Sequence, residues 1–298
     1  CLWGIQKWHA HEEPKAEEAQ RWLGELYAEA SSYLEDNPDS KPEVDAIQMQ
    51  LEAHDAAIWP LFEKTRDWSL DGFKHIQEEL GCAHKVLFLE SAVKARGQEL
   101  VDELIKKGIA KEGERGAIII DLSADNLDIA LLRKSTGAGV YMTSDLALAE
   151  QKFGSHDVAE SINVTGIEQN FYFKQLFRVL QLNGFKHQMT HIGYGLVTLP
   201  EGKMSSRKGN VILYVGLRDQ VMAYMEEEVG KRHTDWSEEK VDEVAKVLTQ
   251  AVLKFTMQKH EAAKTIAFNF DEAVSFEGFS APYLLYMVAR INSLLRKQ

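Results

Sequence analysis

Residues 161–182 have the sequence SINVTGIEQNFYFKQLFRVLQL, which contains the clearest fold signal of the chain. The β-branched residues near its start predict a strand over residues 161–164. Large apolar side chains then recur at intervals of three and four through residues 168–182, which predicts an amphipathic helix. They are Phe173, Leu176, Phe177 and Leu180. Gly184 follows as a C-terminal stop signal, so the stretch has the form of a strand that leads directly into a helix.

The same order of elements occurs on both sides of this stretch. Residues 117–120 predict a buried strand, residues 140–142 a second one, and residues 144–153 a helix with Thr143 as its N-cap. Residues 187–199 fit one more strand. Strands that alternate with helices through short connections predict a parallel, doubly wound sheet, so we expect an α/β fold with a Rossmann-like parallel sheet.

The regions outside this sheet have a helical pattern. In the first third of the chain, four segments with polar faces suit a solvated helical insertion. They are residues 12–30, 43–63, 72–80 and 92–107. The last hundred residues are also helical in pattern, with one apolar stripe and a final helix that begins at Pro282. The stripe consists of Val241, Val244, Leu248, Ala251 and Phe255.

The composition excludes some classes of protein. Of the 298 residues, 45% are hydrophobic and 27% are charged, and no apolar run approaches the roughly 20 residues that span a bilayer. The formal net charge of −12 argues against a protein that coats nucleic acid without preference, although it permits a local basic surface for one RNA partner. Cys1 and Cys82 form neither a disulfide framework nor a zinc pattern, so we expect a reducing, cytoplasmic location.

A basic, hydroxyl-rich loop is predicted at residues 203–210, with the sequence KMSSRKGN. Its cations and hydroxyl groups suit a polyphosphate, although the order of residues is not that of a Walker loop. Gly193 and Gly195 lie shortly before it in a predicted strand, where glycine weakens pairing and so indicates the close approach of another group. An ordinary solvated surface turn is the alternative interpretation.

A second candidate site lies at the predicted strand-to-helix junctions. Tyr141 and Asp145 flank one junction, and Gln169 follows the next strand. Ligands bind at the carboxyl edge of open parallel sheets, where Asp145 could hold a cationic ligand. Alternatively, Asp145 could complement a helix N-terminus and Tyr141 could belong to the core. The histidines are scattered, and we expect no metal site formed by the protein itself.

Five groups of residues resemble the arginyl-tRNA synthetases, a family of class I aminoacyl-tRNA synthetases. They are Trp3-Gly4-Ile5-Gln6, residues 141–147, Gly166-Ile167-Glu168-Gln169 with residues 173–177, residues 191–197 with residues 203–210, and residues 281–286 with residues 289–291. Residues 141–147 have the family's Tyr-x-Thr-x-Asp-x-Ala pattern, and residues 203–210 resemble the Lys-Met-Ser-Lys-Ser signature loop. The resemblance covers nearly the whole chain, and the order and spacing of the groups together make it specific.

The resemblance implies a reaction and a set of site residues. Arginine and ATP would give arginyl-adenylate and pyrophosphate, and the arginyl group would pass to the terminal ribose of tRNA(Arg). The arginine pocket would consist of Tyr141, Asp145 and Gln169. ATP, carrying Mg²⁺, would lie along His191, Gly193, Gly195, Val197, Lys203 and Met204. The catalytic residues that stabilise departing pyrophosphate would be Lys203, Ser205, Ser206, Arg207 and Lys208.

The resemblance also implies an organisation along the chain. Residues 1–12 would end the first half of the catalytic fold, residues 13–115 would form a mainly helical insertion, and residues 116–200 would form the second half of the Rossmann-like domain. Residues 201–275 would hold the signature loop and a helical connection. Residues 276–298 would begin an anticodon-binding helical bundle.

Two departures from the family pattern limit what we expect of the chain alone. Ser206 stands where the signature loop has its second lysine, and Arg207 and Lys208 would replace its charge but not its geometry. The His-Ile-Gly-His motif, which would precede Trp3, is absent. We therefore expect an internal or C-terminal portion of the catalytic core that activates arginine weakly or not at all. A non-catalytic interaction or RNA-binding module is an alternative, as is another class I synthetase, although the cysteinyl enzyme would need zinc-spaced cysteines.

Overall fold

The computed structural model describes residues 1–15, 18–198 and 213–297, and the chain forms two compact units. The first unit comprises Cys1–His84, Val197–Lys259 and Ala267–Gln298, and the second comprises Lys85–Leu196 and His260–Ile266. The predicted phosphate-binding loop at residues 203–210 lies outside the described residues. None of the helices that the structure describes is long and apolar enough to cross a membrane.

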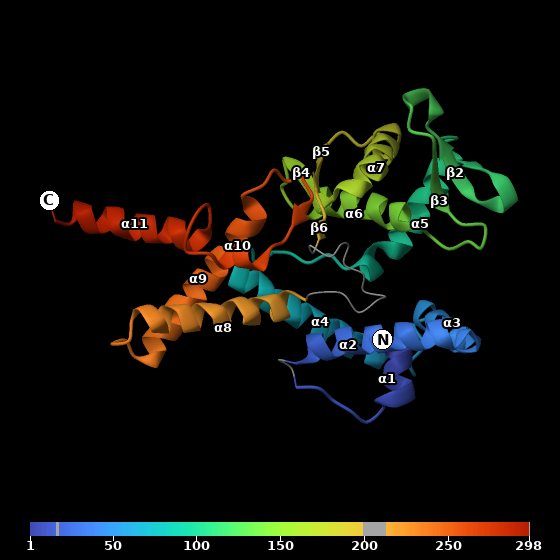
Figure 1. Ribbon diagram of the computed structural model, residues 1–298. Helices are drawn as coiled ribbons and strands as arrows, with labels where there is room; N and C mark the ends of the chain where they lie inside the picture. Colours follow the sequence, from blue (N-terminus) through green and yellow to red (C-terminus); the bar gives the residue numbers. More distant parts are fainter. Residues whose placement is uncertain (16–17, 199–212, 298) are drawn as a thin grey trace. The chain divides into compact units, whose positions relative to one another are not determined.

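The second unit combines helices with two small sheets (Figure 1). Its elements are α5 (Glu90–Lys106), β1 (Lys111–Glu112), β2 (Ile118–Asp121), β3 (Ile129–Arg133), α6 (Tyr141–Ser155), β4 (Glu160–Gly166), α7 (Asn170–Leu182) and β5 (Gln188–Tyr194). Strands β1, β2 and β3 form an antiparallel sheet. Strands β4 and β5 pair in parallel, from Glu160 opposite Gln188 to Gly166 opposite Tyr194.

One apolar core joins these elements. Its fully buried members include Leu104 of α5, Leu132 of β3, Leu146 of α6 and Leu176 of α7. Burying each of these leucines contributes roughly 2 kcal/mol to folding. The predicted strand at residues 161–164 and the apolar face of the following helix are confirmed by β4 and α7. Gly184, at φ +93°, follows α7 in the left-handed conformation that its sequence position predicts.

The predicted parallel sheet is wrong for residues 117–120. These residues fall largely in β2, which pairs antiparallel with β3, with Asp121 opposite Ile129. The connection between the two strands is too short for the crossover that parallel pairing requires. It turns back through Asn126 and Asp128, which adopt positive φ angles of 58° and 50°. Among the described strands of the second unit, β4 and β5 pair in parallel.

Two further predictions in this unit need correction. Residues 140–142 are not a strand, because α6 begins at Tyr141 and the Val140 N–H donates to the Thr143 hydroxyl, at 3.0 Å. Thr143 is therefore the third residue of the helix rather than its N-cap. The predicted strand at residues 187–199 divides into β5 and a short β6 (Val197–Thr198), since the Gly195 N–H donates to the Ala262 carbonyl oxygen instead of continuing the ladder.

The first unit is mainly helical. Its helices are α1 (Leu2–Trp8), α2 (Ala19–Asp36), α3 (Lys41–Glu52), α4 (Trp59–Leu80), α8 (Tyr214–Arg232), α9 (Glu238–Gln258), α10 (Phe270–Val274) and α11 (Ala281–Leu295), and the short strand β7 (Ile266–Ala267) lies at its boundary. The helix predicted over residues 43–63 is interrupted, because His54 adopts a positive φ of 53° and Asp55 caps the turn through the Ala57 N–H. The helix predicted over residues 72–80 is the last part of α4, which ends at Gly81.

Two apolar clusters stabilise the first unit. The smaller is centred on Ile5, Leu23 and Leu26, and the larger is built around α8 and α9, which lie side by side in Figure 1. The predicted apolar stripe of α9 is only half-buried; the most buried side chains are Ala245, Thr249, Val252, Leu253 and Thr256. The buried face differs because α9 contacts α4, α8, α10 and α11, so packing on several sides decides which residues are covered.

Candidate functional site

The Asp145 carboxylate is the centre of the site. Asp145 lies one turn after Tyr141 on α6, half-buried, and it accepts a hydrogen bond from the Tyr172 hydroxyl on α7. Burial raises the pKa of Asp145, and the Tyr172 hydrogen bond opposes that rise by stabilising the charged form. Burial also raises the pKa of Tyr172, so its hydroxyl keeps its proton and remains a donor.

Charged side chains in the described part of the chain influence Asp145 without forming an ion pair with it. Lys152 lies about two turns further along α6, where its Nζ donates to the Asn163 side-chain oxygen at 3.4 Å, and burial lowers the pKa of Lys152. Lys152 favours the charged form of Asp145, whereas Glu90 opposes it. No arginine or lysine in the part of the chain that the structure describes forms an ion pair with Asp145. Within the described residues, the site is therefore a half-buried carboxylate without a paired cation.

The first turn of α6 is held in place by close backbone packing. The Thr143 hydroxyl donates to the Leu132 carbonyl oxygen of β3, and the Thr143 hydroxyl oxygen itself accepts from the Val140 N–H. Gly97 lets α5 approach this turn, because a Cβ atom there would lie 2.2 Å from the Thr143 carbonyl oxygen. Contacts with α5 and β3 thus fix the orientation of the first turns of α6, which carry Tyr141 and Asp145.

Tyr141 is 79% exposed, so the alternative interpretation of this residue as part of the core is wrong. It borders a hollow of about 280 Å³ that is also lined by Glu90, Lys94, Lys134 and Ser144. Tyr141 and Asp145 are four residues apart on one helix and therefore share a face. The phenol of Tyr141 is accessible to a ligand at the start of that face.

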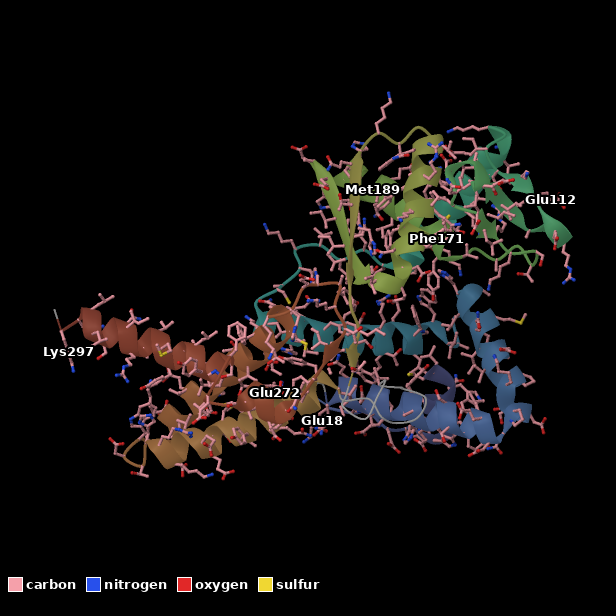
Figure 2. All side chains as sticks on the ribbon, turned by 45° about the horizontal axis from the view of Figure 1, so that its top comes forward. Glu18, Glu112, Phe171, Met189, Glu272 and Lys297 are labelled. Carbon is pink, nitrogen blue, oxygen red and sulfur yellow. The ribbon has the colours of Figure 1, made fainter. Side chains whose placement is uncertain are left out.

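Gln169 lies just before α7 and is exposed. Among the described residues, neither Gln169 nor Tyr141 forms a hydrogen bond with Asp145. Tyr172, three residues after Gln169, makes the connection from α7 to Asp145 instead. No sequence pattern points to Tyr172, because the apolar spacing of α7 falls on its neighbour Phe173. Figure 2 marks the start of α7 by Phe171 and β5 by Met189.

The predicted nucleotide strand packs directly on α7. The His191 ring of β5 stacks on Phe173, with centroids 4.3 Å apart and an interplanar angle of 11°. His191 Nε2 also lies 2.8 Å from the Thr165 hydroxyl of β4. Since Tyr172 and Phe173 are adjacent, α7 supports both Asp145 and His191. One helix therefore links the predicted arginine residues to the predicted nucleotide strand.

The two glycines of this strand are explained by contacts within the chain. A Cβ atom at Gly193 would lie 2.9 Å from the Ile167 Cα, and one at Gly195 would lie 2.1 Å from the Lys264 carbonyl oxygen. The prediction of a close approach at these positions is confirmed, but the approaching group is the chain's own backbone. Val197 is half-buried in β6.

Some predicted site residues cannot be placed in this geometry. Lys203, Met204, Ser205, Ser206, Arg207 and Lys208 all lie outside the described residues. Over residues 1–15, 18–198 and 213–297, no group of three or more His, Cys, Asp or Glu side chains is arranged to hold a metal ion.

Comparisons with known proteins show the family of this chain. The family described as "tRNA synthetases class I (R), catalytic domain" matches residues 4–270. An arginine–tRNA ligase of Bdellovibrio bacteriovorus is 33% identical over all of this chain and 52% of its own length. One of Bacteroides thetaiotaomicron is 33% identical over 95% of this chain and 47% of its own length. The chain thus spans about half the length of the curated relatives it matches.

Solved structures share the fold. The arginyl-tRNA synthetase of Thermus thermophilus superposes on 99% of this chain and 55% of its own, with a TM-score of 0.80 and 22% identity. That of Plasmodium falciparum covers 100% of this chain and 49% of its own, with a TM-score of 0.77 and 19% identity. The family match, which spans most of the sequence, assigns this chain to the class I arginyl-tRNA synthetase catalytic domain family.

Proposed function

We propose that this chain contributes the arginine-recognition part of an arginine–tRNA ligase. The observation that carries the proposal is the state of the Asp145 carboxylate. It is half-buried, it accepts a hydrogen bond from Tyr172, and it has no cationic partner in the described part of the chain. A guanidinium group would neutralise this carboxylate and offer several directed N–H donors. The match to relatives named arginine–tRNA ligase supports arginine as the source of that guanidinium.

Recognition would divide among the three residues of the arginine pocket. Asp145 would bind the guanidinium, the exposed Tyr141 would pack beside the ligand, and the Gln169 amide would donate and accept hydrogen bonds at the edge of the pocket. Lysine has a compact ammonium group in place of the planar fork, so it would bind Asp145 less well. Selectivity for arginine would follow from this difference in shape.

The remaining steps would use ATP and tRNA(Arg). The arginine carboxylate would attack the α-phosphorus of ATP and release pyrophosphate, giving arginyl-adenylate, and the arginyl group would then pass to the terminal ribose of tRNA(Arg). His191, Gly193, Gly195, Val197, Lys203 and Met204 would lie along the ATP, whose phosphates would carry Mg²⁺. Lys203, Ser205, Ser206, Arg207 and Lys208 would stabilise the charge that develops on pyrophosphate. The location that suits this reaction is the cytoplasm.

Titration calorimetry with L-arginine tests the proposal directly. We expect the Asp145→Asn substitution to weaken arginine binding about 100-fold, because it removes one partner of a desolvated charge pair while keeping the shape of the side chain. Asp157→Asn is the matched control, since Asp157 is exposed and belongs to no proposed pocket. Equal affinity of the wild-type chain and the Asp145→Asn variant, or no arginine binding by either, would contradict the proposal.

A further inference from the structure

Tyr172 reaches the site from a different helix and is not one of the residues assigned to the arginine pocket. Its hydroxyl donates to Oδ2 of Asp145 across 27 positions of sequence, from α7 to α6. The Tyr172 ring packs against the core of the second unit and edge-on against Phe173, with centroids 5.3 Å apart. Phe173 in turn is 6% exposed and stacked on His191. The donor is therefore held by packing before any ligand arrives.

We propose that Tyr172 is a positioning residue for arginine recognition: it fixes the plane of the Asp145 carboxylate and keeps that group charged, so that the remaining acceptor positions are ready for a guanidinium. The inference rests on the proposed function. A carboxylate has about four acceptor positions on its two oxygen atoms, so the hydrogen bond to Oδ2 leaves, among the described residues, Oδ1 and part of Oδ2 able to accept. A planar guanidinium binds best to a carboxylate whose plane is already set.

The other charged groups near Asp145 cannot replace this hydrogen bond. Lys152 is on α6 itself and its Nζ is directed to Asn163, while Glu90 of α5 repels the Asp145 charge. On α7, Tyr172 supplies the hydrogen bond that stabilises the carboxylate. Burial favours the neutral carboxyl group, which could not form an ion pair with a guanidinium. The Tyr172 hydrogen bond opposes this effect of burial by stabilising the charged carboxylate.

Two measurements on the full chain test the inference, both with Tyr172→Phe. The phenylalanine ring keeps the packing against Phe173 and removes only the hydroxyl. In a carbon-detected NMR titration, we expect the midpoint of the Asp145 carboxyl to move to higher pH. In calorimetry, we expect affinity for L-arginine to fall about tenfold at neutral pH, because a hydrogen bond to a charged group is lost. The loss should grow as the pH falls, since Asp145 takes up its proton earlier.

Tyr214→Phe is the matched control, because Tyr214 also donates to a carboxylate, that of Glu79, in the other unit. It should change neither the Asp145 midpoint nor the arginine affinity. An unchanged Asp145 midpoint in Tyr172→Phe, or an affinity loss of equal size at every pH, would overturn the positioning role. If Asp145→Asn abolishes binding while Tyr172→Phe does not weaken it, this inference fails and the proposed function stands. If Asp145→Asn has no effect, both fail.

Discussion

The two units of the molecule contain the same chemical pair in different surroundings. In the second unit, Tyr172 donates to Asp145. In the first unit, Tyr214 donates to Glu79 at 3.1 Å, and the Arg218 guanidinium donates to the other oxygen of the same carboxylate, also at 3.1 Å. Burial, and then the charge of Glu79, raise the pKa of Tyr214 to about 12. The first unit thus supplies the tyrosine, the carboxylate and a guanidinium from its own chain.

This difference separates a structural carboxylate from the one that we propose binds a ligand. Glu79 is satisfied on both oxygen atoms by α8, so its charge stabilises the contact between α4 and α8. Asp145 has the tyrosine but, within the described residues, no guanidinium. A half-buried charge without a counter-ion destabilises a fold, so its presence is explained better by ligand binding than by stability.

The units also differ in how their helices approach each other. Gly97 faces the backbone of α6, where a Cβ atom would lie 2.2 Å from a carbonyl oxygen that cannot move independently of its helix. Gly72 of α4 faces the Gln20 side chain, where a Cβ atom would lie 2.6 Å from the amide group. A side chain can change its rotamer, whereas a helix backbone must shift as a whole. The packing of α6 against α5 therefore requires glycine at position 97 more strictly than the packing of α2 against α4 requires glycine at position 72.

The largest effect that sharpens this comparison should come from alanine at these two glycines. We expect Gly97→Ala to lower the free energy of unfolding by about 2 kcal/mol through overpacking. We expect Gly72→Ala to change it by less than about 1 kcal/mol, because the gain in helix propensity offsets the displacement of Gln20. Urea unfolding followed by circular dichroism measures both. Equal losses in the two variants would show that the backbone contact at Gly97 has no special role.

A smaller effect is expected from Glu79→Gln. The substitution removes the charge shared by Tyr214 and Arg218, and because these groups are partly exposed, we expect a loss of about 1 kcal/mol in unfolding free energy. Glu78→Gln is the control, since Glu78 lies 4.0 Å from Lys74 on an exposed surface. Arginine affinity, measured by calorimetry, should be the same in both variants. A loss of arginine binding in Glu79→Gln would break the distinction between the two carboxylates.

The smallest effect concerns the stability of Asp145→Asn. Because the pKa of Asp145 in the folded protein is raised above its ordinary value of 3.8, ionisation of this group destabilises the fold. The wild-type chain should lose stability as the pH rises from 3.8 through the raised folded pKa, and the variant should not. The variant should therefore be slightly more stable at neutral pH and lose this advantage at acidic pH.

Unfolding midpoints measured across this pH range check the sign of the effect. Asp157→Asn should show no such dependence. A variant less stable than the wild-type chain at neutral pH would mean that the Asp145 charge stabilises the fold, as the Glu79 charge is expected to do. The difference between the two units would then disappear.

Much of the fold could be predicted because its signals are local. Apolar spacing predicts α7, and the glycines at positions 108 and 184 mark helix ends in the left-handed conformation. The direction of β2 could not be predicted from periodicity, because a buried apolar run has the same pattern in parallel and antiparallel sheets. The sequence predicts too late a start for α6, because Val140 and Tyr141 favour strands. In the structure, the Thr143 hydroxyl accepts a hydrogen bond from the Val140 N–H and so stabilises a helical turn at this position.

The residue types at the candidate site, the order of the family's motifs and the positions of most helices follow from the sequence, because they depend on spacing along the chain. It identified Asp145 as a candidate for binding a cation. The folded structure was needed to show that Asp145 is half-buried, that Tyr172 donates a hydrogen bond to it, and that Gly193 and Gly195 allow close contacts within the chain. These facts depend on which distant segments pack together, and hydrogen bonds and close approaches between such segments leave no periodic pattern in the sequence.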